Sequence, residues 1–214
     1  PYSAGYISIM EWIVSSLQHL YPGSRIVVRP DERIAVKEGV NFSKIASAYA
    51  GTETVEIKEH NLRMMVNLKT GHKTGFFLDQ RENRFVLSQY CRGRDVLDCF
   101  CYTGGFAISA MLAGAKSATG IDLDEKALDT AQENARLNSV EVRFQHINVF
   151  DHLRDMISKG VQTDVIILDP AKLAGCTEEI KRAHRTYGDV NRLGMQVIKP
   201  GGILLTCSCS GLVS

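Results

Sequence analysis

The sequence lacks a long apolar run, a G-x-G-x-x-G glycine pattern and a net charge of any size. No apolar run approaches the roughly 20 residues that a membrane-spanning helix needs, and residues 1–20 lack the charged and apolar regions of a signal peptide. We therefore expect a cytoplasmic protein with no membrane partner. With 25 Lys and Arg against 24 Asp and Glu, the net charge of +1 excludes nucleic-acid binding by global attraction alone.

Cysteine occurs six times, but without the dense spacing of a secreted disulfide scaffold, so we expect reduced thiols. Two Cys-x-Cys pairs, Cys99 with Cys101 and Cys207 with Cys209, lack the Cys-x2-Cys spacing typical of zinc sites, and we expect no metal. Along a strand, Cys207 and Cys209 would face the same side. The spacing alone leaves open whether they are inert buried thiols or a reactive group.

Positive and negative charges nearly balance over the whole chain, but not within every segment. From Lys58 to Arg94 the chain carries eight basic residues and three acidic ones, an excess of 8 − 3 = 5 positive charges. Two interpretations stay open, a solvated charged face and a surface that follows the phosphates of a nucleic acid.

The first part of the chain, residues 1–74, is predicted to form a small α+β module, which the family resemblance given below implies to be of an RNA-binding type. Apolar residues at helical spacing predict a helix within 6–21, with Ile9, Trp12, Ile13, Leu17 and Leu20 on one face. Two short strands are expected at 24–30 and 32–39. A hairpin with His60 and Asn61 at its turn is expected over 53–71, and a loop then leads into a helix that Asp79 could cap.

From residue 95 onward, apolar strands and helices alternate strictly. Such repetition requires a parallel sheet covered on both faces, so the predicted fold class is α/β, a doubly wound Rossmann-like domain over residues 75–214. The expected strands are 95–100, 117–122, 142–147, 164–170 and 202–210, and the expected helices are 104–114, 124–138, 150–160 and 176–198, the last with a possible break at Gly188.

The loop after the first of these strands is the expected ligand site, because open α/β sheets bind ligands at the carboxyl ends of their strands. Gly104 and Gly105 are adjacent there, and Asp98 lies inside the strand end. Asp122 ends the next strand, 18 residues after Gly104, where a carboxylate can accept hydrogen bonds from a ribose. An acidic strand end suits a cationic ligand, so S-adenosylmethionine fits better than NAD. The alternative is that both acids only cap local structure, Asp98 a turn and Asp122 the next helix.

Two further strand ends carry polar side chains. Asn148 could accept a hydrogen bond from an adenine amino group, or it could cap the following helix. Asp169 and Pro170 end the fourth strand of the domain, where they could border a reaction centre or simply form a turn.

Four segments together resemble the bacterial RlmI-like family, which makes 5-methylcytosine in 23S ribosomal RNA with S-adenosylmethionine. They read TGFFLDQRENR, CFCYTGGFAISA, DPAK and LLTCSCSGL, and the similarity covers essentially the whole chain in order. The resemblance implies a catalytic pair, Cys209 and Asp169. It implies cofactor binding by Asp79, Gln80, Arg81, Asp98, Phe100, Tyr102, Thr103, Gly104, Gly105, Asp122, Leu123, Asn148, Val149, Asp169 and Pro170.

The chemistry of cytosine explains why a thiol is needed. Carbon-5 is too weak a nucleophile to attack a sulfonium methyl group, but addition of a thiolate at carbon-6 makes carbon-5 reactive. We predict that Cys209, near the end of the last strand, is this thiol and that Cys207, deeper in the strand, is packing. The base must also be unstacked to receive both groups, so single-stranded or flipped ribosomal RNA is the expected partner.

Three features depart from the family pattern. Ala171 and Leu173 stand where the family has Pro and Phe, which bears on the shape of the base pocket, and Asn148 stands where Asp is common. The chain also appears as a fragment, without the family's amino-terminal PUA-type domain and its last strands. Alternatives are methylation of a guanine nitrogen, which needs no thiol, a non-catalytic RNA-binding factor, and an NAD enzyme. The sequence does not decide whether the protein forms a homodimer.

Overall fold

The structure, a computed structural model, describes residues 4–29, 36–39, 54–68, 71, 75–174 and 176–209. The chain divides into two compact units, one made of residues 1–55 with 67–70 and the other of residues 56–66 with 71–214. Within the described ranges, none of the helices combines the length and the apolar character needed to cross a membrane.

In the first unit, a 3-10 turn, η1 (Ala4–Tyr6), precedes α1 (Met10–Leu20), which confirms the predicted helix. The apolar face identified from the spacing is largely exposed. Met10 and Val14 are the buried side chains, whereas Trp12 is 80% exposed and Leu20 is 68% exposed. Residues 24–29, predicted as a strand, have no regular structure. The strand predicted at 32–39 lies mostly outside the described residues, and its described end is helical at 36–37.

The predicted hairpin is confirmed as β1 (Thr54–Glu59) and β2 (Leu62–Asn67), which form a two-stranded sheet. His60 at the turn has a φ of 51°, in the left-handed region that tight turns require. Residues 56–66 of this hairpin belong to the second compact unit. The domain boundary at residue 75 stays a prediction.

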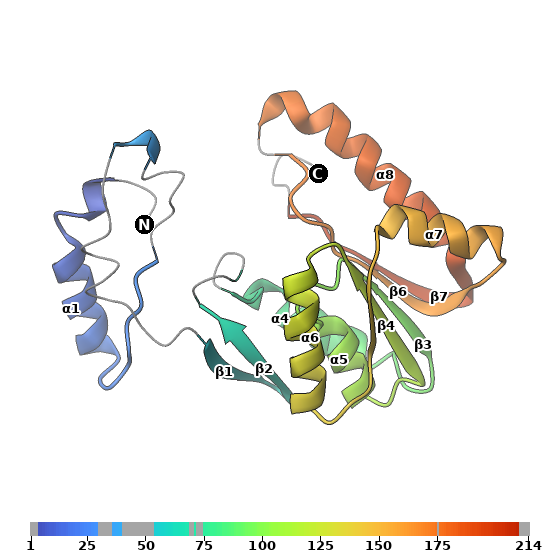
Figure 1. The fold of residues 1–214 in the computed structure, drawn as a ribbon, viewed down its shortest axis with the longest axis horizontal. Helices are drawn as coiled ribbons and strands as arrows, with labels where there is room; N and C mark the ends of the chain where they lie inside the picture. The colour runs from blue at the N-terminus through green and yellow to red at the C-terminus, as the bar shows by residue number, and fades with distance from the viewer. Residues whose placement is uncertain are drawn as a thin grey trace. The chain divides into compact units, whose positions relative to one another are not determined.

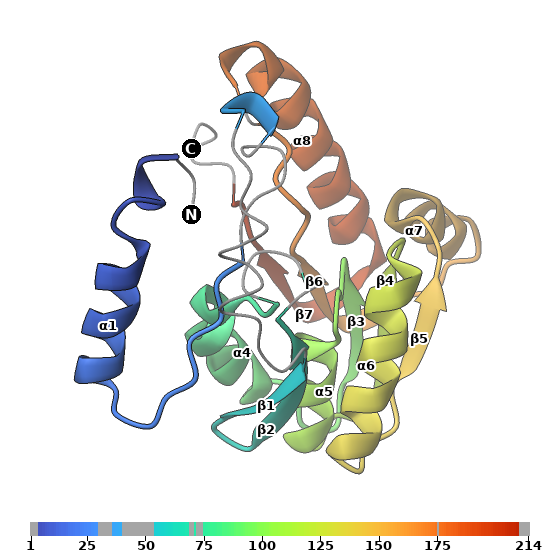
Figure 2. The same cartoon turned by 60° about the vertical axis from the view of Figure 1, so that its left-hand side comes forward.

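The second unit is built on a five-stranded sheet with the order β5-β4-β3-β6-β7 (Figures 1 and 2). All four neighbouring pairs are parallel, which confirms the doubly wound α/β class. The chain starts in the middle of the sheet, moves to one edge, and then crosses back over β3 to the other edge. The strands are β3 (Asp95–Cys99), β4 (Ser117–Asp122), β5 (Arg143–His146), β6 (Thr163–Leu168) and β7 (Ile198–Thr206).

Helices cover both faces of this sheet (Figure 2). Alternate residues of β6 separate the two layers. Ile166 and Leu168 pack with residues of α7 and α8, whereas Val165 and Ile167 pack with residues of α4 and α5. Both faces are apolar because both are covered. The helices are α4 (Arg81–Ser88), α5 (Gly105–Leu112), α6 (Glu125–Leu137), α7 (Val149–Ser158) and α8 (Ile180–Val197), with 3-10 turns η2 (Leu78–Gln80) before α4 and η3 (Thr177–Glu179) before α8.

Three local predictions are corrected. Asp79 lies within η2 and does not cap α4, whose N-cap residue is Gln80. Helix α8 continues through Gly188, which is exposed on the helix surface with open space around it. Strand β7 begins earlier than expected and ends at Thr206, so Cys207 and Cys209 both follow the strand instead of lying in it.

Candidate functional site

The candidate site lies where β3, β4 and β6 end. In the parallel register, Cys99 at the end of β3 is paired with Ile121 of β4 on one side and Leu168 of β6 on the other. Asp122 and Asp169, the next residues of these two strands, are therefore brought to the same edge of the sheet. This is the edge at which open α/β sheets bind ligands.

Asp98 is the buried acid of this edge, with 1% of its surface exposed. Its Oδ2 accepts a hydrogen bond of 3.0 Å from the backbone N–H of Ala107, in the first turn of α5. Its Oδ1 is buried and has no hydrogen-bond partner among the described residues. Burial raises the pKa of Asp98 to about 8, the Ala107 N–H opposes this rise, and the charges of Asp169 and Asp122 add to it. One oxygen of Asp98 therefore accepts an N–H from the first turn of α5, and the other oxygen has no described partner. A cationic ligand beside this carboxyl group would favour its ionised form.

The loop after β3 has an unusual backbone. Phe100 and Tyr102 have φ values of 64° and 50°, and Gly104 has a φ of 83°. Left-handed conformations at non-glycine residues are unfavourable and persist where the surroundings hold them. Here the backbone N–H of Tyr102 donates to Asp122 Oδ2 at 2.8 Å, and the Tyr102 ring packs edge-on against Phe77 with centroids 5.4 Å apart. Contacts within the protein therefore hold the loop in this shape.

Two features require glycine at position 104. Its φ is left-handed, and its close neighbours leave no space for a side chain. A Cβ at this position would lie 2.9 Å from the Phe144 ring and 3.2 Å from Ala131 Cβ. We predict that Gly104→Ala lowers the free energy of unfolding by about 1–3 kcal/mol and weakens cofactor binding, because the loop must move. Gly93→Ala is the matched control, since Gly93 has a similar φ of 70° but nothing within 4 Å. Urea unfolding and cofactor titration of both variants check this. Equal losses in the two would contradict a packing role for Gly104.

Asp122 acts on the loop and not as a helix cap. Its Oδ1 accepts from the Asp124 N–H at 3.0 Å, and Asp124 itself caps α6 through the Ala127 N–H. The alternative interpretation of Asp122 as the N-cap of the next helix is therefore wrong. Leu123 beside it is 59% exposed, so an apolar side chain is available at the rim.

The side chains of Asn148 and Val149 are both engaged within the protein. Asn148 is the N-cap of α7, and its Oδ1 accepts hydrogen bonds from the N–H groups of Phe150 and Asp151. The Val149 side chain is 3% exposed and lies in the core. The helix-cap alternative for Asn148 is confirmed, and contact of either residue with adenine stays a prediction.

Gln80 links the segment before α4 to the strand ends. Its Nε2 donates to Asp169 Oδ1 at 3.4 Å, and its Oε1 accepts from the Cys207 thiol at 3.9 Å. Asp79 and Arg81 flank it with exposed side chains, and Arg81 pairs with Glu82 at 3.7 Å. The structure thus brings Gln80 and Asp169 together, as expected for one site.

The two cysteines after β7 have different surroundings. Cys207 is half-buried, and burial with the nearby Asp169 charge raises the pKa of its thiol to about 11. Cys209 is exposed, and its Sγ lies 3.8 Å from the carbonyl oxygen of Pro170. Burial also raises the thiol pKa of Cys91, Cys99 and Cys101. Cys209 is therefore an accessible thiol beside Pro170, at the edge of the sheet where Asp169 lies.

Sequence reasoning missed a buried amide that joins the hairpin to the loop. Asn134 in α6 is fully buried, accepts from the Met65 N–H at 2.7 Å and donates to the Thr103 carbonyl at 3.3 Å. One turn later, Asn138 binds both the N–H and the carbonyl of Arg63. The one signal in the sequence is a pair of asparagines four residues apart in an otherwise ordinary helical pattern.

A buried ion pair makes the second connection. Arg84 Nε and Nη2 each lie 2.7 Å from a carboxylate oxygen of Glu59, with side chains 4% and 6% exposed. Arg84 Nη2 also donates to the Phe77 carbonyl at 3.0 Å, and the guanidinium stacks over the Phe76 ring. Arg84 thereby holds the segment that leads to Gln80.

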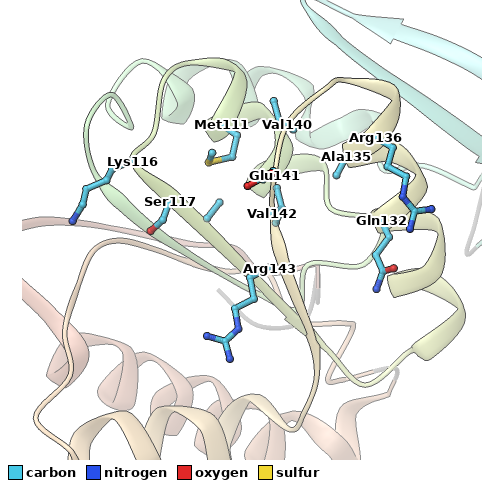
Figure 3. A pocket seen from close by; sticks show the side chains of 11 residues that line it. Met111, Lys116, Ser117, Gln132, Ala135, Arg136, Val140, Glu141, Val142 and Arg143 are labelled. Carbon is cyan, nitrogen blue, oxygen red and sulfur yellow. The ribbon is translucent and has the colours of Figure 1, made fainter.

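A cavity in the same unit lies elsewhere. It has a volume of about 590 Å³ and lies near the beginnings of β4 and β5, where Ser117 and Arg143 line it (Figure 3). These are the amino ends of the strands, whereas Asp98, Asp122 and Asp169 lie at or after the carboxyl ends. We therefore assign the site from its polar groups and not from this cavity.

The sequence is similar to those of known proteins. A family model described as S-adenosylmethionine-dependent methyltransferase matches residues 40–213. Ribosomal RNA large subunit methyltransferase I of Aeromonas salmonicida (strain A449) is 43% identical over 215 residues, covering 99% of this chain and 54% of the relative. The protein of the same name from Pseudoalteromonas atlantica (strain T6c / ATCC BAA-1087) is 44% identical over 216 residues, with the same shares. The chain thus spans about half the length of these curated relatives.

Solved structures support the fold alone, because their sequence identity is low. The crystal structure of SMU.776 complexed with SAH has a TM-score of 0.74 and 22% identity, over 94% of this chain and 52% of that one. The SAM-dependent methyltransferase from Agrobacterium tumefaciens has a TM-score of 0.65 and 22% identity, over 76% and 55%.

Proposed function

Because the chain belongs to the S-adenosylmethionine-dependent methyltransferase family, we propose that it binds S-adenosylmethionine at the ends of β3 and β4 and methylates ribosomal RNA at carbon-5 of cytosine. The observation that carries the choice of cytosine is the exposed Cys209 thiol beside Pro170, at the same rim as Asp169. The names of the relatives from Aeromonas and Pseudoalteromonas support ribosomal RNA as the substrate class.

The residues present fit the proposed cofactor. Asp98 Oδ1 is a buried acceptor without a described partner, which suits the positive charge of the methionine portion. Gly104 and Gly105 keep the start of α5 free of side chains, and Asp122 lies at the next strand end for the ribose. Gln80 would lie over the methionine end with Asp79 and Arg81. When bound, S-adenosylmethionine supplies an electrophilic methyl group.

The residues of this chain have distinct proposed tasks. The Cys209 thiolate forms a bond to carbon-6 of cytosine, which moves electron density to carbon-5 and makes that atom nucleophilic. Asp169, held by Gln80, hydrogen-bonds the edge of the base. Removal of the carbon-5 proton after methylation restores the ring double bond and expels the thiolate. Cys207 is not assigned this task, because its raised pKa keeps the thiol protonated near pH 7.

Product analysis tests the proposed function. The protein is incubated with S-adenosylmethionine and ribosomal RNA, and the digested nucleosides are identified by mass spectrometry. We expect 5-methylcytidine. Methylated guanosine instead would replace this proposal with nitrogen methylation, and cofactor binding without any methylated product would favour the non-catalytic RNA-binding alternative. The cytoplasmic location stays a prediction.

The buried Asp98 predicts how stability depends on pH. Its folded-state pKa of about 8 is above the ordinary 3.8, so between these values the folded state binds more protons than the unfolded state. The contribution of Asp98 to stability is therefore complete below about pH 4 and is lost as the pH rises toward 8. We expect Asp98→Asn to be more stable relative to the wild type at pH 8 than at pH 5, and to bind S-adenosylmethionine more weakly. Urea unfolding at both pH values measures this, and parallel pH profiles would contradict it.

A further inference from the structure

We propose that the amino-terminal half of α8 binds the phosphate backbone of the RNA substrate, through Lys181, Arg182 and Arg185. This inference rests on the proposed function, because it names the surface with which the enzyme would hold its RNA. Three observations support it. Several basic residues between Lys58 and Arg94 pair with glutamates, these three side chains do not pair with a described carboxylate, and their helix follows the loop that begins at Asp169.

The basic residues between Lys58 and Arg94 are less available for contact with RNA phosphates than the sequence suggested. Arg84 is buried against Glu59, Arg63 pairs with Glu56 at 2.7 Å, and Arg81 pairs with Glu82 at 3.7 Å. Lys69 and Lys73 lie outside the described residues. Glutamates thus pair with three of the eight basic side chains, so fewer of these positive charges are open to phosphates than the sequence count indicates.

Three basic residues in the amino-terminal half of α8 differ from these, although Arg192 in its second half pairs with Asp189 at 3.5 Å. Lys181, Arg182 and Arg185 are all exposed, and in the part of the chain that the structure describes none of them is within 4.0 Å of a carboxylate. Lys181 and Arg185 are four residues apart and Arg182 and Arg185 are three apart, so like charges are neighbours on the helix surface. They also lie in the first two turns, where positive charge opposes the helix dipole. The arrangement costs helix stability, and a polyanion bound there would offset that cost.

The position of this cluster connects it to the reaction rim. The loop that leaves β6 at Asp169 leads through η3 into the first turn of α8 (Figure 1). Ala174 of that loop is fully buried and packs with Ala183 and Tyr187 on the inner face of α8. The inner face of the helix is thus fixed to the loop that follows Asp169, while the basic side chains face solvent. An RNA strand with its cytosine at Cys209 would have its neighbouring phosphates near this surface.

Neutralisation of the cluster tests the inference. The variant Lys181→Gln/Arg182→Gln/Arg185→Gln is compared with Lys126→Gln/Arg136→Gln/Arg143→Gln, which removes the same charge from exposed residues outside both α8 and the run from Lys58 to Arg94. Binding of a fluorescently labelled single-stranded RNA is measured by anisotropy over a range of salt concentrations. We expect the α8 variant to bind RNA on the order of tenfold or more weakly and to lower the slope of log K against log salt by about 2, because each phosphate contact on a single strand contributes about 0.7.

The controls separate this inference from the proposed function. The control variant should bind RNA within about twofold of wild type, and both variants should bind S-adenosylmethionine normally. The α8 variant should melt at the same temperature as wild type or higher, since like-charge repulsion is removed. RNA binding and slope equal to wild type would overturn the α8 surface and leave the proposed function intact. Wild type that binds cofactor but no RNA would overturn both.

Discussion

Cys209→Ser is expected to lower the rate of methyl transfer by about 10⁴-fold or more, because loss of a covalent nucleophile removes the step that makes carbon-5 reactive. Serine keeps the size of the side chain, but its hydroxyl is far less ionised than a thiol at neutral pH. Binding of S-adenosylmethionine should change little, since the Asp98 and Gly104 loop is not altered. Single-turnover transfer of a labelled methyl group to RNA, with cofactor titration alongside, measures both quantities.

Cys207→Ser provides the matched comparison two residues away. The Cys207 thiol is half-buried, contacts Gln80 and has a pKa of about 11, so it is expected to be dispensable as a nucleophile. We expect this variant to retain activity within about tenfold of wild type. If Cys207→Ser abolished transfer and Cys209→Ser retained it, the assignment of the two thiols would be reversed.

Arg84→Ala is expected to lower the free energy of unfolding of the second unit by about 3–5 kcal/mol, because Glu59 would be left buried without its partner. The change would also remove the hydrogen bond to Phe77 and the stacking on Phe76. Since these contacts hold the segment before Gln80, cofactor binding should weaken as well. Urea unfolding followed by circular dichroism gives the stability change.

Arg63→Ala supplies a control in the hairpin that carries Glu59. Arg63 also forms a two-bond pair with a glutamate, Glu56, but both side chains are over 40% exposed. Solvent screens such pairs, so we expect little change in stability. In the double variant Glu59→Leu/Arg84→Leu most of the loss should be recovered, because no charge remains buried. Equal effects of Arg84→Ala and Arg63→Ala would contradict a special role for the buried pair.

The parallel sheet could be predicted because its signal is local and repeated. Apolar runs such as residues 165–168 alternate with amphipathic helices, and only a sheet covered on both faces satisfies both patterns. Asp98 and Gly104 could be found for the same reason, since a strand end fixes where they lie. The prediction that Asp98 faces a ligand drew on residue type and position alone, and the structure adds an unmet oxygen at that place.

Features that depend on distant partners could not be predicted. The sequence counts Arg63, Arg81 and Arg84 as one basic run, because it does not show that glutamates neutralise all three. Asn134 reads as an ordinary helix residue until Met65 and Thr103 are seen on either side of it. The amphipathic pattern of α1 misled for a related reason. The apolar face chosen from spacing included Trp12, while the buried contacts are made by Met10 and Val14.

The most direct test of the central claim is mass spectrometry of the protein after incubation with S-adenosylmethionine and RNA that carries 5-fluorocytosine. Fluorine at carbon-5 cannot leave as a proton, so the thiolate cannot be expelled after methylation. We predict a covalent adduct whose mass includes the methylated base, mapped to Cys209 and absent from Cys209→Ser. Normal cofactor binding and methylation of unmodified RNA, without any adduct on Cys209, would contradict the thiol mechanism.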